Sequence, residues 1–77
     1  MTFDEANQKL AKYNVTAELR TPTMILANSR KVDYTVSLNE SHQIMFQSWE
    51  RKHDIQITKY LKIVEILYKL AESQFNK

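Results

Sequence analysis

Histidine and serine side chains are the groups in this sequence that could carry out nucleophilic or metal chemistry. The two histidines, His42 and His53, are too far apart for the H-x-x-x-H spacing that puts two ring nitrogens on one helical face. The pairs Ser41-His42 and His53-Asp54 contain the residue types of a hydrolytic site, but their spacing does not arrange a nucleophile, a base and an orienting acid. The sequence therefore predicts no catalytic residue and no metal site.

The acidic residues have structural explanations instead. Asp4 and Glu5 fall at the start of a predicted helix. Glu65 and Glu72 each follow a lysine, Lys62 or Lys69, by three residues, a spacing that allows ion pairs on a helix surface. Glycine and cysteine are both absent, which excludes glycine-rich phosphate loops, thiol nucleophiles and cysteine-ligated metals. We therefore expect a protein that is not an enzyme, uses no cofactor and has no small-molecule substrate.

The N-terminal residues have the pattern of a short amphipathic helix. Thr2 and Glu5 match a capping box, in which each side chain accepts a hydrogen bond from the other residue's backbone. The helix is predicted to run from Phe3 to Tyr13. Asn14 is expected to follow it in the left-handed conformation, because asparagine tolerates that region next best after glycine.

After the first helix the hydrophobic period becomes that of β-strands. Apolar and polar residues alternate clearly in one segment, which predicts a strand with one buried face. The flanking segments predict two short strands or one broken strand before it, and one strand after it. The four segments are Val15–Leu19, Met24–Ala27, Val32–Leu38 and His42–Trp49.

The last two segments are predicted to form a hairpin with a three-residue loop, Asn39–Ser41. This loop sets which side chains face each other across the hairpin. It also places Met45 and Trp49 on the outer face of the sheet. The inward pairs in this register are Val36 with Ile44 and Tyr34 with Phe46.

The segment Ile57–Phe75 predicts one long helix whose apolar arc is wider than a single sheet contact requires. A second apolar seam lies beside its main row, and either the first helix covers that seam or a partner does. The seam consists of Ile63, Ile66 and Leu70. The main row, expected to pack on the sheet, consists of Ile57, Leu61, Val64 and Tyr68.

These elements predict an α+β fold over residues 1–77, with an N-terminal helix, a three- or four-stranded antiparallel sheet and a long C-terminal helix on one sheet face. No apolar run approaches the roughly 20 residues that span a bilayer, and the N-terminus lacks the pattern of a signal peptide. We therefore expect a cytoplasmic protein that does not bind membranes.

Two binding functions fit this fold. The first is a protein-interaction module, possessing exposed apolar side chains that would bind a protein partner or a second copy of the chain. The second is a nucleic-acid-binding module with a basic and aromatic surface around the central hairpin. The first would use Met45, Trp49, Arg51, Lys52, Ile63, Ile66 and Leu70; the second would use Arg30, Lys31, Arg51, Lys52 and Trp49.

The order of helix, three strands and helix resembles the double-stranded RNA-binding domain in outline. That family has a lysine-rich start to its second helix and glycine-rich strand connections, whereas this chain has Thr58–Lys62 there and no glycine, so its activity is not carried over. In composition, a short chain with lysine and asparagine but without glycine or cysteine resembles the small accessory proteins of phages and mobile elements. That resemblance implies a protein that binds or inhibits a host protein.

Overall fold

Helices and strands follow one another in the predicted order in the computed structural model, which describes residues 1–50 and 56–75. A 3₁₀ turn over Ala11–Tyr13 follows the first helix. The helices and strands are α1 (Phe3–Leu10), β1 (Thr16–Thr21), β2 (Met24–Asn28), β3 (Val32–Leu38), β4 (Ile44–Glu50) and α2 (Ile57–Phe75). This confirms the α+β fold and gives the sheet four strands.

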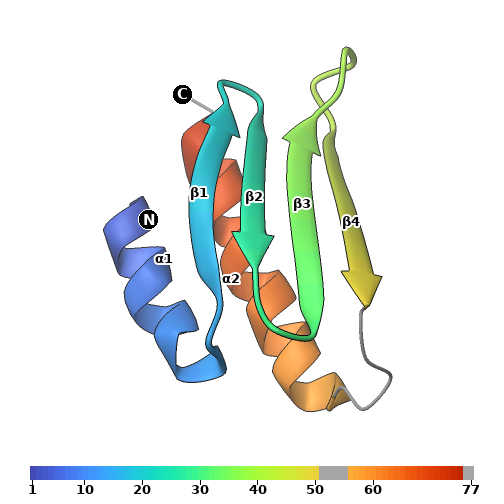
Figure 1. The fold of residues 1–77 in the computed structure, drawn as a ribbon. Helices are drawn as coiled ribbons and strands as arrows, with labels where there is room; N and C mark the ends of the chain where they lie inside the picture. Colours follow the sequence, from blue (N-terminus) through green and yellow to red (C-terminus); the bar gives the residue numbers. More distant parts are fainter. Residues whose placement is uncertain (51–55, 76–77) are drawn as a thin grey trace.

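The strands form one antiparallel sheet in the order β1-β2-β3-β4. The helix α2 crosses one face of this sheet, and α1 lies beside the β1 edge, where it contacts both β1 and α2 (Figure 1). None of the described helices lies on the opposite face of the sheet. Among the described residues, the β1 edge has a helix next to it and the β4 edge has none, so the two edges have different surroundings.

The first helix starts as predicted, but its α-helical part ends at Leu10, and Ala11–Tyr13 continue as the 3₁₀ turn. The Thr2 hydroxyl oxygen accepts a hydrogen bond from the Glu5 N–H (3.2 Å), and the Glu5 carboxylate accepts one from the Thr2 N–H (3.3 Å). Asn14 ends the 3₁₀ turn at φ 60°, in the left-handed region. The capping box and the left-handed asparagine are both confirmed.

The β3–β4 hairpin forms with a register two residues away from the predicted one. Val36 faces Phe46 rather than Ile44, and Tyr34 faces Ser48. Because a two-residue shift keeps every side chain on its own face, the assignment of inner and outer faces is still correct.

The residues of the turn explain this shift. The Asn39 side-chain oxygen accepts hydrogen bonds from the backbone N–H groups of Ser41 and Gln43, both at 2.9 Å. Asn39 therefore precedes the loop as an Asx turn instead of lying inside it. His42 takes the left-handed position that the loop needs, at φ 60°.

The core lies between the inner sheet face and the two helices. Tyr34 and Val36 of β3 contribute to it, and no polar or charged side chain among the described residues is buried with them. One continuous cluster joins α1, the sheet and α2. Its buried members are Ala6, Leu10, Val15, Ala17, Ile25, Ala27, Val32, Tyr34, Val36, Ile63, Leu67, Leu70 and Ala71.

The face that α2 buries differs from the prediction. Ile57, Leu61 and Tyr68 were expected on the sheet, but these side chains are 74, 59 and 47 % exposed. The buried residues are instead Ile63, Leu67, Leu70 and Ala71.

The reason is that α2 packs against α1 as well as the sheet, so its buried arc points between them. The Met1 amino group donates a hydrogen bond to the Ser73 hydroxyl (2.9 Å) and joins the N-terminus to the end of α2. Ile63 and Leu70 therefore lie in the core and Ile66 packs against it, so the predicted seam is covered within the chain.

Candidate interaction surface

The β1 edge of the sheet is closed by a side chain of α1. The Asn7 amide nitrogen donates to the Ala17 carbonyl (3.1 Å), and the Asn7 amide oxygen accepts from the Ala17 N–H (2.8 Å). The side-chain amide thus offers β1 the same donor and acceptor that a neighbouring strand would offer. Another strand cannot pair with β1 at Ala17 while α1 is in place.

The β4 edge has no such partner among the described residues, because β4 is the last strand of the sheet. The backbone N–H of Leu38 in β3 points to β2, since it donates to the Thr23 carbonyl (2.9 Å), and the next N–H, of Asn39, points to the β4 side. By the alternation of an antiparallel ladder, the backbone groups of Ile44, Phe46 and Ser48 face outward.

Most of β4 lacks the residues that discourage pairing at a sheet edge, and its one charged residue is Glu50 at the end of the strand. Exposed edge strands usually carry lysine, proline or a bulge that prevents another strand from adding to them. The segment Ile44–Trp49 has no charge and no proline, and its pairing with β3 is regular along its length. Its backbone and its side chains therefore both favour contact with another chain.

An apolar row of α2 lies beside this edge. The Tyr60 hydroxyl and the Ser48 hydroxyl are 2.9 Å apart, which joins the start of α2 to the second half of β4. At the other end of the strand, Ile44 and Tyr68 line one open hollow of about 500 Å³. The helix α2 therefore begins close to the end of β4 and crosses the inner face of the sheet diagonally toward β1, which leaves the hollow beside the first half of β4 (Figure 1).

Helical spacing puts Ile57, Leu61 and Tyr68 on one side of α2, the side on which Tyr68 faces the hollow. Next to them, Ile44 and Phe46 on the inner face of β4 are only partly buried. We call these residues the β4–α2 surface: Ile44, Phe46, Ile57, Leu61 and Tyr68.

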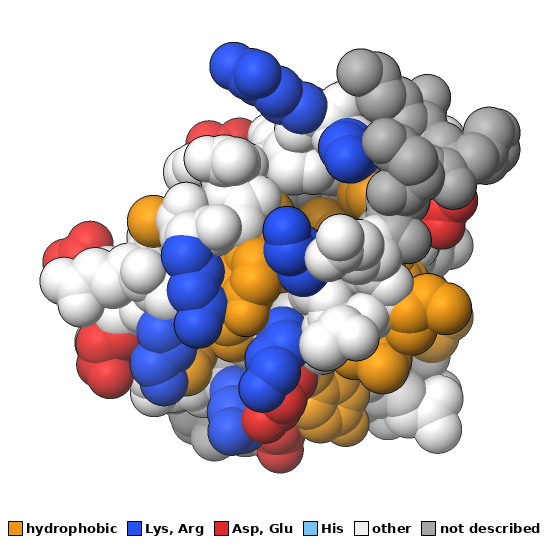
Figure 2. Space-filling view, turned by 90° about the horizontal axis from the view of Figure 1, so that it is seen from below, with side chains coloured by type: hydrophobic (Ala, Val, Ile, Leu, Met, Phe, Trp, Pro, Cys, Tyr) orange, Lys and Arg blue, Asp and Glu red, His pale blue; other side chains and the backbone are white. Residues whose placement is uncertain are grey.

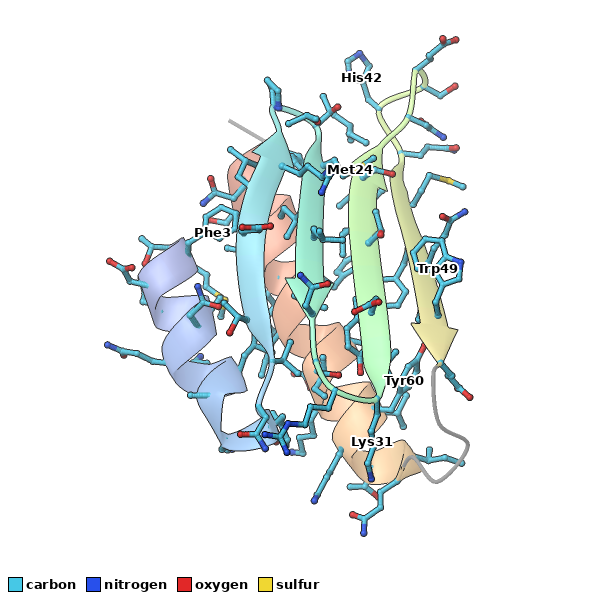
Figure 3. The ribbon with its side chains drawn as sticks, in the orientation of Figure 1. Phe3, Met24, Lys31, His42, Trp49 and Tyr60 are labelled. Carbon is cyan, nitrogen blue, oxygen red and sulfur yellow. The ribbon has the colours of Figure 1, made fainter. Side chains whose placement is uncertain are left out.

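The outer face of β4 adds two exposed apolar side chains to the same edge. Met45 and Trp49 are 45 and 52 % exposed, on the face predicted from the alternation of the strand. Figure 3 shows Trp49 on β4, and Trp49 pairs with Asp33, two residues after Lys31, so it lies in the half of the sheet that ends at the β2–β3 turn. Arg51 and Lys52, predicted beside Trp49, lie outside the described residues.

The sequence suggested Ile63 and Leu70 as part of an interface, and this prediction is wrong because both side chains are buried. These side chains are 6 and 0 % exposed, and Ile66 packs against the same core. They stabilise the contact of α2 with α1 and the sheet, and cannot meet a partner while the fold is intact. The exposed apolar residues of α2 are on the opposite side of the helix.

A second distinct feature is a basic pocket at the end of the molecule that holds the β2–β3 turn. The cavity has a volume of about 370 Å³ and is lined by Lys12, Arg30, Lys31 and Lys59, with Gln56 and Ser29 among the polar residues. No acidic side chain is among the described residues that line it. Figure 2 shows lysine and arginine side chains gathered around this end.

The base of this pocket is aromatic. Tyr34 and Tyr60 line it, and their ring centroids are 5.9 Å apart. Burial, with smaller contributions from the neighbouring Tyr60 and Glu50, raises the pKa of Tyr34 to about 12. Trp49 is not among the lining residues, and Arg30 and Lys31 line the pocket together with Lys12 and Lys59.

The described side chains form no cluster that could hold a metal ion. His42 lies exposed at the tip of the β3–β4 hairpin, and no three histidine, aspartate or glutamate side chains of residues 1–50 and 56–75 gather as a metal site requires. His53 and Asp54 lie outside the described residues. Within the same residues, no helix combines the length and the apolar character needed to cross a membrane.

Comparison of the chain with protein-family models, with curated proteins and with solved structures finds no match.

Proposed function

We propose that this protein is a non-enzymatic interaction module that binds another polypeptide through its β4–α2 surface. The observation that carries the proposal is the exposed row of Ile57, Leu61 and Tyr68 beside an edge strand that is uncharged from Ile44 to Trp49. Contiguous exposed apolar side chains of this kind usually mark a contact with another molecule. Met45 and Trp49 extend the same edge on its outer face.

The gain from covering this surface is large enough to matter for binding. Removing the exposed parts of Ile57, Leu61 and Tyr68 from water contributes on the order of 3 kcal/mol before the entropy of association is counted. Backbone hydrogen bonds to β4 would add specificity for an extended segment. A partner that supplies both a strand and apolar side chains fits this surface best.

The proposal also covers the biological setting. A short chain of this composition fits a phage or mobile-element accessory protein that acts in the cytoplasm by binding or inhibiting a host protein. Arg51 and Lys52, which follow β4 in the sequence, would add basic contacts next to Trp49.

Capture from the native cell with matched variants tests the proposal. Leu61→Glu places a charge in the middle of the β4–α2 surface, whereas Lys62→Glu places one at the adjacent exposed position of the same helix. We expect wild type and Lys62→Glu to retain the same protein partner, and Leu61→Glu to lose it. Equal capture by all three proteins, or neither capture nor self-association of the wild type, would contradict the proposal.

Nucleic-acid binding is the second candidate function. The observation in its favour is the convergence of Lys12, Arg30, Lys31 and Lys59 around one pocket. Trp49 with Arg51 and Lys52 would extend the contact along the sheet, as the sequence suggests.

A mobility-shift assay over a series of salt concentrations tests this second candidate. Binding to RNA or DNA should weaken steeply with added salt and should weaken further in a Lys12→Ala, Lys59→Ala variant. Lys69→Ala is the control, because Lys69 pairs with Glu65 (3.2 Å) on the exposed surface of α2. The absence of any shift at low salt would remove this candidate.

A further inference from the structure

We infer that the occupant of the β4 edge is a second copy of this chain, with the two β4 strands antiparallel about a twofold axis that passes through Gln47. The inference rests on the proposed function and names its partner. The four-stranded sheets of the two copies would then join into one continuous sheet. Three features of the described residues support this arrangement: the length of β4, its outer face and the shape of its inner side.

The length of β4 fixes the register. The strand covers Ile44–Glu50, so the only antiparallel register that pairs all of it with itself has Gln47 at the centre. The backbone groups of Phe46 and Ser48 face the open edge. Phe46 of one copy would therefore exchange backbone hydrogen bonds with Ser48 of the other copy. Gln47 lies opposite Gln47 of the second copy. The two form a non-hydrogen-bonded pair, the kind of pair in which side chains come closest.

The outer face becomes self-complementary in this register. Met45 of one copy lies opposite Trp49 of the other, and the twofold axis makes this contact twice. A methionine beside an aromatic ring is a favourable cross-strand pair. The pairing would cover both exposed apolar side chains of the outer face of β4.

The inner side has a protrusion at one end of β4 and a hollow at the other. Ile57 and Leu61 protrude beside the second half of the strand, where Tyr60 contacts Ser48. The open hollow beside the first half is lined by Ile44, Met45 and Tyr68 together with the polar side chains of His42, Gln43 and Glu72. Antiparallel pairing brings the protrusion of each copy to the hollow of the other, because it places opposite ends of the strands together.

The area is sufficient for a dimer. Taking about 200 Å² for a fully exposed large side chain, the exposed fractions leave roughly 550 Å² of apolar side chain per copy. Two copies would bury roughly 1,100 Å² before the backbone is counted, which is just above the area that separates specific contacts from incidental ones. The side chains in this sum are Met45, Trp49, Ile57, Leu61 and Tyr68.

A disulfide at the twofold axis tests the register. The chain contains no cysteine, so Gln47→Cys has the only thiol, and two such residues would lie within the Cα separation that a disulfide needs. Glu18→Cys is the control, because Glu18 is exposed in the same cross-strand row, on the β1 edge. Under mild oxidation we expect a covalent dimer from Gln47→Cys only. Equal dimer from both variants, or none from Gln47→Cys, would overturn the register.

A charge exchange tests the same axis without a covalent bond. Gln47→Lys and Gln47→Glu each put like charges opposite each other, and either should raise the Kd of the dimer by about tenfold or more. A mixture of the two variants should associate again, because only the mixed pair places lysine opposite glutamate. Failure of the mixture to recover would contradict an axis at Gln47.

Sedimentation of the wild type across a concentration series separates this inference from the proposed function. A dimer that the Gln47 variants weaken supports both. A strict monomer whose capture of another protein still depends on Leu61 overturns the second copy and leaves the interaction module standing. A strict monomer without any such capture removes both.

Discussion

The two edges of the sheet differ in whether their outward-facing backbone groups have hydrogen-bond partners within the described residues. At β1, the Asn7 side-chain amide bonds to both backbone groups of Ala17, and α1 covers the edge. At β4, the strand is uncharged from Ile44 to Trp49 and lies last in the sheet. An unprotected edge strand promotes association. Under the proposed function, the contact with another chain therefore lies at β4 rather than at β1.

The largest effect is expected from weakening the packing of α1, the helix that closes the β1 edge. Leu10 is fully buried and joins α1 to the core. Leu10→Ala should lower the free energy of unfolding by about 3 kcal/mol through lost burial and the cavity left behind. Chemical denaturation measures this change. A loss below about 1 kcal/mol would show that α1 does not depend on this anchor.

A smaller effect is expected from pH, on the β4 side of the sheet. The Tyr34 ring packs near Phe46 of β4 and Tyr60 of α2, and burial raises its pKa from 10.0 to about 12. The unfolded chain therefore ionises this tyrosine first, so stability is fully present below pH 10 and is lost as the pH rises from 10 to 12.

This loss should reach about 2 kcal/mol and should be absent in Tyr34→Phe. Denaturation curves of both proteins at a series of alkaline pH values measure the difference. Parallel loss of stability in the two proteins would show that Tyr34 is not the responsible group.

The next effect concerns the closure of the β1 edge itself. Asn7→Ala removes both hydrogen bonds to Ala17 and leaves its backbone groups partly buried without these partners. The free energy of unfolding should fall by about 1 to 2 kcal/mol. Gln8→Ala, at an exposed position of the same helix, is the matched control. Unchanged stability in Asn7→Ala would mean that water replaces the amide fully.

The smallest effect on folding is expected on the β4–α2 surface. Leu61→Gln should change stability by less than about 0.5 kcal/mol, because Leu61 is already mostly exposed. Leu67→Ala, six residues further along α2 and fully buried, is the contrasting variant and should cost about 3 kcal/mol. Similar losses in both variants would show that the exposed row supports the fold instead of binding.

Local signals in the sequence predicted much of the fold. The capping box of Thr2 and Glu5 and the left-handed Asn14 depend on neighbouring residues alone, and α2 has the predicted bounds. The alternation in β4 placed Met45 and Trp49 correctly on the outer face. The same alternation could not set the hairpin register, because a shift by two residues leaves every face unchanged.

The remaining features depend on contacts between distant segments. The apolar arc of α2 is wide enough to pack in more than one orientation, and the docking of α1 decides that Ile63 and Leu70 are buried while Leu61 is exposed. From the sequence alone, Asn7 cannot be distinguished from an ordinary polar residue on a helix surface, because its partner Ala17 is on another element. The sequence therefore identified one exposed face of β4 but missed the row of α2 beside it.

Amide hydrogen exchange at the two edges tests the central claim most directly. The Phe46 and Ser48 amides face the open edge, whereas the Ala17 amide is bonded to Asn7. As the protein concentration rises, we expect exchange at Phe46 and Ser48 to slow while exchange at Ala17 stays constant. Exchange at Phe46 and Ser48 that stays equally fast at every concentration, and when a captured partner is added, would contradict the claim that β4 is the binding edge.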